Sequence, residues 1–211
     1  MERRTVHVAV YDTLADWEFG YATAHLRDTS FHRPPRPGID VVTVAEGREP
    51  VTTMGGLRLQ PDLALADLRP EHSAMLVLPG ASLWDAGERN APFARAARTF
   101  LEAGVPVAAI CGATAGLARE GLLDDRAHTS AAAPYLAATG YKGGDHYREA
   151  DAVTDESGDL ITAGPTEPVA FAREILARLD VCEPEVLDAW FRLFSASDPS
   201  AFEVLRAARL R

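Results

Sequence analysis

Short apolar runs alternate along this chain with segments in which apolar residues recur every three or four positions. The runs at 6–10, 39–45, 74–78 and 105–110 are predicted strands, and the last two are apolar at successive positions, as in strands buried on both faces of a parallel sheet. Helices are predicted in the periodic segments, such as 91–103. The alternation predicts an α/β fold: a single-domain, doubly wound, mostly parallel sheet with helices on both faces, which binds ligands outside the carboxyl ends of its strands.

Two hairpins and a helical tail complete the predicted elements. Residues 51–60, broken by a Gly-Gly pair, resemble a small hairpin, and the turn 155–159 joins two further short strands. After a helix at 168–179, an apolar stripe over 183–211 predicts a helix-turn-helix that covers the core, or forms a dimer surface as the second choice. We therefore expect an α/β domain over 1–182 and a C-terminal helical extension packed on the same domain.

Composition narrows the class of protein. With 211 residues, 47% of them hydrophobic, the chain can bury a full core without disulfides or metals. The net charge of -10 makes nucleic acid and anionic membranes poor partners. A signal-peptide core and an apolar span are both lacking, so we expect a cytoplasmic protein in which Cys111 and Cys182 are free thiols. The six histidines show no metal-ligand spacing and there is no nucleotide-binding glycine motif, so neither a metal nor a cofactor is expected.

Cys111 is the strongest chemical candidate. It stands between the apolar run 105–110 and the small-residue segment 112–117, which is a predicted junction of strand and helix. A sharp turn there would hold the thiol in a strained, exposed position at the carboxyl edge of the sheet. The N–H groups of the new helix would favour the thiolate, so a depressed pKa is predicted for Cys111. The alternative is a buried structural cysteine.

Several segments together resemble the DJ-1/ThiJ/PfpI superfamily, which has the class I glutamine amidotransferase-like variant of the flavodoxin-like fold. The resemblance follows the order of elements from about residue 5 to residue 180 and includes a strand that ends in Leu-Pro-Gly and the cysteine at the elbow. The segments that carry it are 8–11, 16–18, 76–80, 106–112 and 160–164.

The resemblance implies a carboxylate that contacts the nucleophilic cysteine, and the matching residue is Glu18. We expect Glu18 in the first turn of a helix capped by Asp16, where its carboxyl can move a proton if burial raises its pKa. The alternative is an ordinary acid at a helix N-terminus.

The chain departs from the family pattern at two positions. Gly112 follows the cysteine where many relatives have a histidine, which argues against peptidase chemistry. Ser130 falls at or beside the place of another family histidine, on a predicted strand at 126–130. His128 lies two residues earlier and faces the same way on that strand, so it is a candidate catalytic residue or, alternatively, a hydrogen-bonded histidine outside the site.

An oxyanion hole can be expected from backbone groups near the elbow. The N–H groups of Gly112 and of Ala81 would converge on the oxygen of the attacked carbonyl, and Gly80, at the end of the preceding strand, is the third residue expected at this oxyanion hole. Trp84 either walls the pocket or is a packed aromatic residue.

These residues and the resemblance imply a cofactor-free enzyme. We expect a cysteine hydrolase or lyase that acts on a small carbonyl compound, either in a glyoxalase-type reaction or by hydrolysis of a small amide. Glutamine amidotransferase activity is not expected, because the segment with Glu167 lacks the histidine that accompanies this glutamate in true amidotransferases. The alternative is a redox or stress sensor that works through an oxidisable Cys111 without turnover. The resemblance also implies a homodimer.

Overall fold

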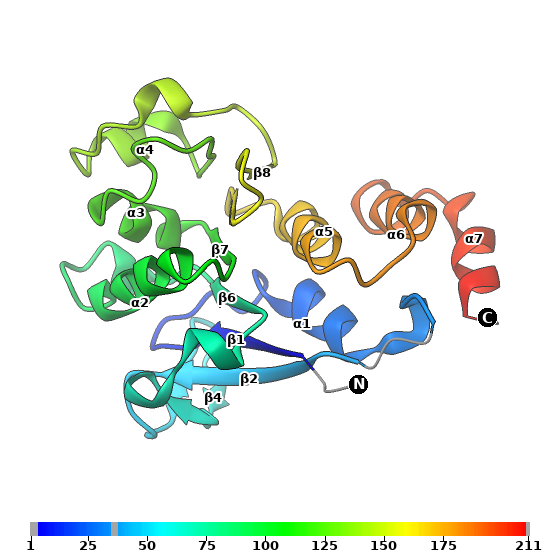
Figure 1. Cartoon of the computed structure of the whole chain (residues 1–211), viewed down its shortest axis with the longest axis horizontal. Helices are drawn as coiled ribbons and strands as arrows, with labels where there is room; N and C mark the ends of the chain where they lie inside the picture. The colour runs from blue at the N-terminus through cyan, green and yellow to red at the C-terminus, as the bar shows by residue number, and fades with distance from the viewer. Residues whose placement is uncertain (1–3, 35–37, 210–211) are drawn as a thin grey trace.

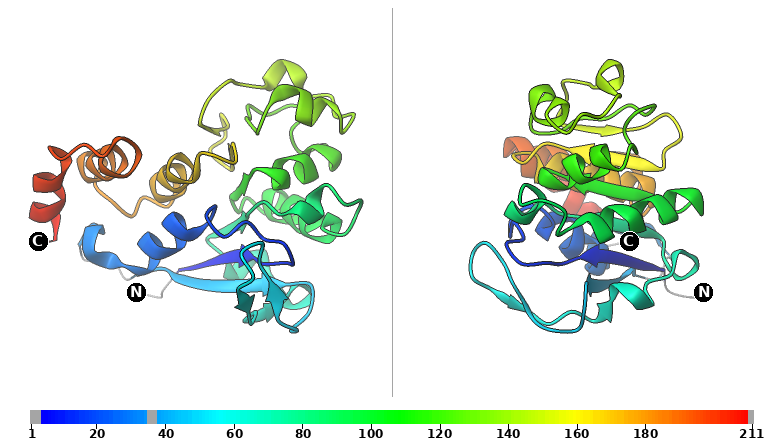
Figure 2. Two further views of the ribbon diagram at one scale, coloured as in Figure 1. Left: turned by 180° about the vertical axis from the view of Figure 1, so that it is seen from behind. Right: turned by 90° about the vertical axis from the view of Figure 1, so that its left-hand side faces the viewer.

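A seven-stranded sheet forms the centre of the protein, whose computed structural model describes residues 4–34 and 38–209. The strands lie in the order β5-β2-β1-β6-β7-β9-β8, and every neighbouring pair is parallel except β8 with β9. The right-hand view in Figure 2 shows this order from yellow β9 down to blue β1 and cyan β2. The strands are β1 (Thr5–Ala9), β2 (Asp40–Ala45), β5 (Leu63–Ala64), β6 (Met75–Leu78), β7 (Val107–Ile110), β8 (Ala152–Thr154) and β9 (Leu160–Ala163). The predicted fold class is confirmed.

Helices cover both faces of this sheet (Figure 1). On one face lie α1 (Gly20–Arg27), α5 (Pro168–Arg178), α6 (Pro184–Ala196) and α7 (Ala201–Ala208). The other face carries α2 (Ala91–Glu102) and α3 (Gly112–Arg119), with the short α4 (Ala133–Ala137) beside α3. Two hydrophobic clusters, one under each layer, hold the sheet between them. Because successive strand residues point to opposite faces, a strand apolar at every position serves both clusters.

The strand register brings the carboxyl ends of the central strands to one edge. Val8 of β1 pairs with Val77 of β6, Val77 with Ala108 of β7, and Ala108 with Ile161 of β9. All four residues are buried in the same cluster. The residues that follow β1, β6 and β7 therefore lie side by side, which is where a doubly wound sheet places its ligands.

The C-terminal tail packs on the same core as the sheet. Trp190 of α6 is 2% exposed, and its ring meets that of Tyr21 edge to face, with centroids 6.4 Å apart. Leu187, Ala201 and Leu205 belong to the cluster that lies under α1 and α5. Beyond this contact, α7 extends away from the sheet (Figures 1 and 2).

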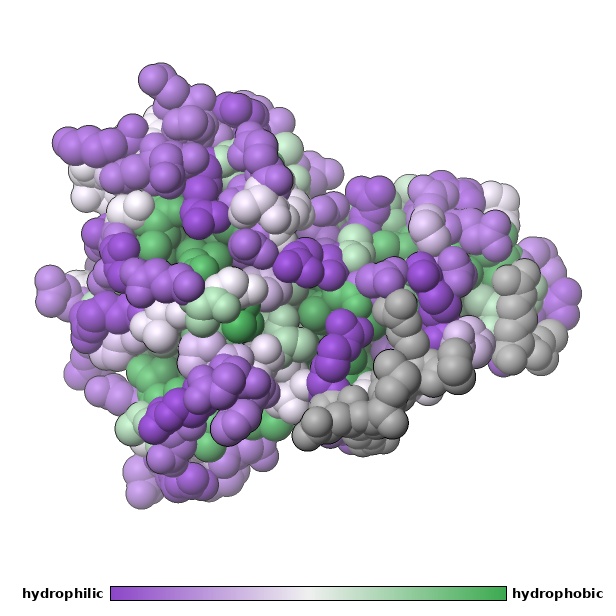
Figure 3. All heavy atoms as spheres, viewed as in Figure 1, coloured by the Kyte–Doolittle hydropathy of each residue, from purple (hydrophilic) through white to green (hydrophobic). Residues whose placement is uncertain are grey.

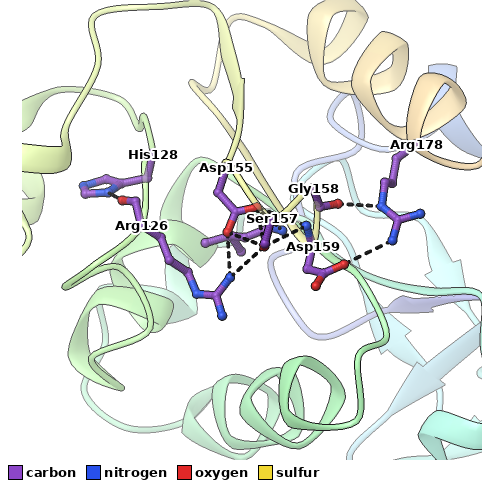
Figure 4. A network of polar contacts seen from close by, with 8 residues as sticks. Arg126, His128, Asp155, Ser157, Gly158, Asp159 and Arg178 are labelled. Atoms are coloured by element: carbon purple, nitrogen blue, oxygen red, sulfur yellow. Dashed lines mark hydrogen bonds and ion pairs between the residues drawn. The ribbon is translucent and has the colours of Figure 1, made fainter.

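The two hairpins form where glycine and turn residues predict them. β3 (Val51–Thr52) and β4 (Arg58–Leu59) make a small antiparallel ribbon outside the main sheet. The turn between β8 and β9 is held by Asp155, whose Oδ2 accepts a hydrogen bond from Arg126 at 2.6 Å (Figure 4). Burial by itself would raise the pKa of Asp155. Hydrogen bonds from the Leu160 N–H, Arg126 and Ser157 have the larger effect together, and they leave this pKa below its usual value.

Two predicted elements differ from the structure. The first helix begins at Gly20, so Glu18 lies in the preceding loop. Asp16 does not cap this helix; its carboxylate accepts hydrogen bonds from the Thr53 hydroxyl at 2.5 Å and the Gly55 N–H at 2.7 Å, and thereby fastens the first hairpin to the Glu18 loop. The predicted strand at 126–130 is reduced to one bridge, between His128 and Tyr147.

The outer surface is mostly polar. Figure 3 shows hydrophilic residues over most of one face, with apolar residues between them. Among the described residues, no helix is both long enough and apolar enough to cross a membrane.

Candidate active site

Cys111 occupies a strained turn between β7 and α3. Its φ of 58° and ψ of -128° lie where a side chain is rarely tolerated, at a cost on the order of 1–3 kcal/mol. The Cys111 N–H continues the sheet by donating to the Ala163 carbonyl at 3.1 Å. The chain then turns at once into α3, so the thiol stands at the carboxyl edge of the sheet and is part-exposed. This is the elbow that the sequence predicts.

Two buried hydroxyl groups hold this turn from behind. The Thr114 hydroxyl donates to the Cys111 carbonyl at 2.6 Å, and the Thr114 N–H donates to the same oxygen at 3.1 Å. The Ser130 hydroxyl lies 2.6 Å from that of Thr114. Ser130, which was expected beside the pocket, is 6% exposed and supports the elbow through Thr114. This role of Thr114 was not predicted from the sequence. A hydroxyl one turn into the helix can, however, reach back to the carbonyl at the elbow.

Glu18 reaches the same point from the loop before α1. Its side chain is fully buried, its Oε2 accepts a hydrogen bond from the Gly80 N–H at 2.5 Å, and its carboxyl is hydrogen-bonded to the Cys111 thiol. The other oxygen, Oε1, is buried with no partner among the described residues. The structure therefore brings together two residues that are 93 positions apart in the printed sequence.

Gly80 makes this approach possible. A Cβ at this position would lie 2.6 Å from Glu18 Oε2, 2.8 Å from Cys111 Cβ and 3.0 Å from Cys111 Sγ. Any side chain would therefore force the pair apart. Gly80 is also expected at the oxyanion hole, but its N–H group cannot serve there, because it donates to Glu18.

The pKa values of the pair shift in the same direction. Burial raises the pKa of Glu18 to about 7, against the hydrogen bonds from Gly80 and Cys111. Burial, followed by the neighbouring Glu18 carboxylate, raises the pKa of Cys111 to about 12, and the Gly112 N–H opposes this only in part. The predicted depressed pKa of Cys111 is therefore wrong: loss of water and a nearby negative charge outweigh the helix N-terminus.

Gly112 and Ala81 lie next to each other beside the thiol. The Gly112 N–H points to the sulfur, and a Cβ on Gly112 would be 3.3 Å from the Ala81 carbonyl oxygen. Ala81 has an extended backbone and forms an isolated bridge with Leu14, which fixes the loop after β6. The two residues expected to form the oxyanion hole are thus neighbours.

Trp84 is a packed aromatic residue, the second of the two expected roles. It ends the short 3-10 helix η4 (Ser82–Trp84), is 2% exposed, and its indole N–H donates to the Tyr11 hydroxyl at 3.0 Å. Its ring fills the space beside α3, where a Cβ on Gly116 would lie only 2.2 Å away. Trp84 therefore sets the position of α3 and of the elbow at its start.

His128 is engaged away from the thiol. Its Nδ1 is 2.7 Å from the Arg126 carbonyl oxygen, and its Nε2 is 3.0 Å from the Tyr141 hydroxyl, so both ring nitrogens have partners (Figure 4 shows the first). Desolvation lowers the pKa of His128. The expectation that it shares a face with Ser130 is wrong because 126–130 is not a regular strand. Among the described residues, no hydrogen bond links His128 to Cys111, whereas Glu18 contacts the thiol directly.

Asp85 and Tyr135 form a hydrogen-bonded pair near Cys111 that was not predicted from the sequence. The Tyr135 hydroxyl donates to Asp85 Oδ1 at 2.8 Å, and both side chains interact electrostatically with Cys111. Asp85 directly follows Trp84, so its position could be inferred once η4 was placed, whereas Tyr135 belongs to α4, which the hydrophobic pattern does not predict.

Known proteins share the fold and much of the sequence of this chain. The model of the DJ-1/PfpI family matches residues 4–178. The chain is 38% identical over 205 residues to the "Uncharacterized protease YoaZ" of Bacillus subtilis (strain 168), with 96% of each chain covered. A thiJ/pfpI family protein from Bacillus anthracis has a solved structure with a TM-score of 0.92 and 36% identity, over 99% of this chain and 98% of the other. The DJ-1 superfamily protein Atu0886 from Agrobacterium tumefaciens has a TM-score of 0.80 and 34% identity, over 92% and 98%. The chain therefore belongs to the DJ-1/PfpI family.

Proposed function

We propose that this protein is a cofactor-free cysteine hydrolase or lyase that acts on a small carbonyl compound. The observation that carries the proposal is the strained Cys111 turn, whose thiol is hydrogen-bonded to a fully buried Glu18. A buried carboxyl with a pKa of about 7 is suited to accept and return a proton near neutral pH.

In the first step, Cys111 attacks the carbonyl carbon while Glu18 takes the thiol proton. A new S–C bond forms, and the electron pair of the C=O π bond moves to the oxygen. The N–H groups of Gly112 and Ala81 are the proposed donors to that oxygen. Because Glu18 removes the proton during the attack, a free thiolate with a low pKa is not needed, which agrees with the raised pKa of Cys111.

The second step depends on the substrate. With a small amide, the C–N bond breaks, Glu18 returns the proton to the leaving nitrogen, and water then hydrolyses the thioester. With a 2-oxoaldehyde, Glu18 returns the thiol proton to the oxygen anion, which gives a hemithioacetal. Glu18 then moves the C1 proton to C2 while the hydroxyl proton passes from O1 to O2, and the product is a thioester of the hydroxy acid. Water releases the hydroxy acid, so neither route needs an external oxidant or reductant.

The raised thiol pKa supports turnover over the redox-sensor alternative. Oxidation by peroxide requires the thiolate, and burial together with Glu18 disfavours that form of Cys111. The name "uncharacterized protease" belongs to two Bacillus subtilis relatives. We favour small substrates over peptides for this chain, since the thiol has only a carboxyl group as its proton partner and His128 is engaged elsewhere.

The experiment measures steady-state turnover of purified protein with methylglyoxal, a set of small amides and a casein-derived peptide. We expect turnover of one small carbonyl compound, a loss of at least about 10³-fold in Cys111→Ser, and a loss of about 10²-fold in Glu18→Gln. Variant His128→Ala serves as the matched control and should keep most of the activity. Stoichiometric loss of peroxide with no turnover of any compound would overturn the proposal in favour of the sensor.

A further inference from the structure

Behind the nucleophile, two buried hydroxyl groups form a chain of hydrogen bonds that ends on the Cys111 carbonyl oxygen. The Thr114 hydroxyl lies 2.6 Å from this oxygen and 2.6 Å from the Ser130 hydroxyl. Thr114 is fully buried and Ser130 is 6% exposed, so water has little access to either group. Hydrogen bonds in such a setting are electrostatically stronger than the same bonds in water, and successive bonds polarise one another.

The direction of each bond in this chain follows from the chemistry of its groups. A carbonyl oxygen only accepts, so the Thr114 hydroxyl must donate its one proton to the Cys111 carbonyl. Towards Ser130 the Thr114 oxygen can then only accept, and the Ser130 hydroxyl must be the donor. The chain therefore runs from Ser130 through Thr114 to Cys111, with all its dipoles aligned.

The accepting oxygen belongs to the same peptide unit as the Gly112 N–H. In a planar trans peptide the C=O and N–H bonds point in opposite directions, so groups that hold the Cys111 carbonyl also aim the Gly112 N–H. This N–H points to the Cys111 sulfur. The Thr114 N–H donates to the same carbonyl oxygen at 3.1 Å as part of the first helical turn. The hydroxyl chain is an addition to that backbone bond, and it depends on two side chains.

We propose that Thr114 and Ser130 are positioning residues that aim and polarise the Gly112 N–H as a donor to the oxyanion. Electron density drawn from the Cys111 carbonyl oxygen towards the hydroxyl chain makes the N–H of the same peptide unit a stronger donor. The transition state gains most, because the negative charge on the substrate oxygen develops only as Cys111 attacks. The catalytic part of this inference rests on the proposed function, whereas the polarised N–H is a property of the free protein.

The experiment combines steady-state kinetics with a double-mutant cycle. Thr114→Val removes the hydroxyl with little change of shape and should lower kcat about 10-fold, with KM within about 2-fold of the wild type. Ser130→Ala should lower kcat about 3-fold, because it removes only the polarising donor. In the Thr114→Val background Ser130→Ala should have no further effect, since Ser130 acts through the Thr114 hydroxyl. Thr114→Ser keeps the hydroxyl and should restore most of kcat.

The amide signal of Gly112 gives a second readout that needs no substrate. In ¹H–¹⁵N NMR spectra of the free protein, Ser130→Ala should move this signal upfield, and the move should vanish in the Thr114→Val background. Thr129→Val is the matched control, because it removes a neighbouring buried hydroxyl that donates to the Ala150 carbonyl at 3.0 Å. This control should keep kcat and the Gly112 signal close to those of the wild type. If Thr114→Val does not fold, Ser130→Ala and Thr129→Val still decide the matter.

The inference is overturned if Ser130→Ala leaves either the Gly112 signal or the kcat of an active wild type unchanged. It is also overturned if Ser130→Ala has the same effect with and without the Thr114 hydroxyl, or if the loss lies in KM alone. If the wild type turns over no compound while Ser130→Ala still moves the Gly112 signal through Thr114, the proposed function fails and the polarised N–H stands. The two failures are therefore distinguishable.

Discussion

At the scale of single residues, the chemistry depends on how Glu18 and Cys111 share a buried space. Burial raises the pKa of both groups; the Glu18 carboxylate raises the pKa of Cys111 further, whereas the hydrogen bond from the Cys111 thiol lowers that of Glu18. Gly80 permits their contact because it has no side chain. The same pair therefore affects both the reactivity of the Cys111 thiol and the stability of the fold. The two effects can be measured in separate experiments.

Alkylation by iodoacetamide should show the raised pKa of Cys111. We expect the rate at Cys111 in the wild type to keep rising above pH 9 with no plateau near neutrality, because burial and Glu18 disfavour the thiolate. Glu18→Gln removes the carboxylate charge and should speed alkylation at pH 8 by about 10-fold, while turnover falls. The measurement is mass spectrometry of the Cys111 peptide over time. A plateau below pH 8 in the wild type would show that the thiolate is favoured after all.

Stability should depend on pH through Glu18. Its pKa is raised from 4.5 when unfolded to about 7 in the fold, so the native state binds more protons than the unfolded chain between these values. The contribution is fully present below pH 4.5 and is lost as the pH rises to 7, by about 3 kcal/mol in the free energy of unfolding. Glu18→Gln should lack this loss and be more stable than the wild type at pH 8. Urea unfolding at pH 5 and pH 8 measures the difference, and parallel pH profiles for the two proteins would contradict the prediction.

At the scale of elements, the elbow depends on how η4 and α3 pack. Trp84 lies so close to α3 that Gly112 and Gly116 leave no room for larger residues. Thr114 and Ser130 hold the other side of the same turn by hydrogen bonds. The strained backbone of Cys111 is therefore fixed by packing on one side and by hydroxyl groups on the other.

Gly116→Ala tests this packing. The new Cβ would lie 2.2 Å from the Trp84 ring, so α3 or Trp84 must move, and we expect a loss of about 1–3 kcal/mol in the free energy of unfolding. Turnover should fall as well, because α3 begins at the elbow. Gly144→Ala is the control, since a Cβ there meets nothing within 4 Å. Equal stability of the two variants in urea would mean that the helix is not held by Trp84.

At the scale of the whole molecule, the sheet, its two helix layers and the tail share one core. Trp190 of the tail is buried in the same cluster as strand residues Val8 and Ile161. We therefore predict that the tail unfolds together with the α/β body rather than as a separate unit.

Trp190→Ala should show this coupling. Removing a buried indole should cost about 3–5 kcal/mol in the free energy of unfolding, and the variant should still unfold in a single transition. Far-ultraviolet circular dichroism and the accessibility of Cys111 to a thiol reagent should report the same midpoint. The control is Phe202→Ala, because Phe202 is 56% exposed and should cost little. Two separate midpoints in the wild type would show that the tail is independent.

The sequence by itself determined the fold class and the elbow at Cys111, and its resemblance to the family implied the partnership with Glu18. Strands apolar at successive positions can be buried only between two helix layers, and the residues that follow parallel strands must meet at one edge of the sheet. The fold class and the elbow need only the period of the apolar residues and the order of the segments, so they can be derived without coordinates, whereas Glu18 was identified through the family resemblance.

Only the tertiary structure decided the protonation of the thiol, the position of His128 and the use of Gly80. A pKa depends on how much water is removed and on which charges approach, and neither follows from residue order. The direction in which the His128 side chain points depended on whether residues 126–130 form a regular strand. They form an irregular segment, in which the Arg126 carbonyl and the Tyr141 hydroxyl hold the ring. Gly80 faces Glu18 because two distant loops converge there, and such contacts arise only when the whole chain has packed.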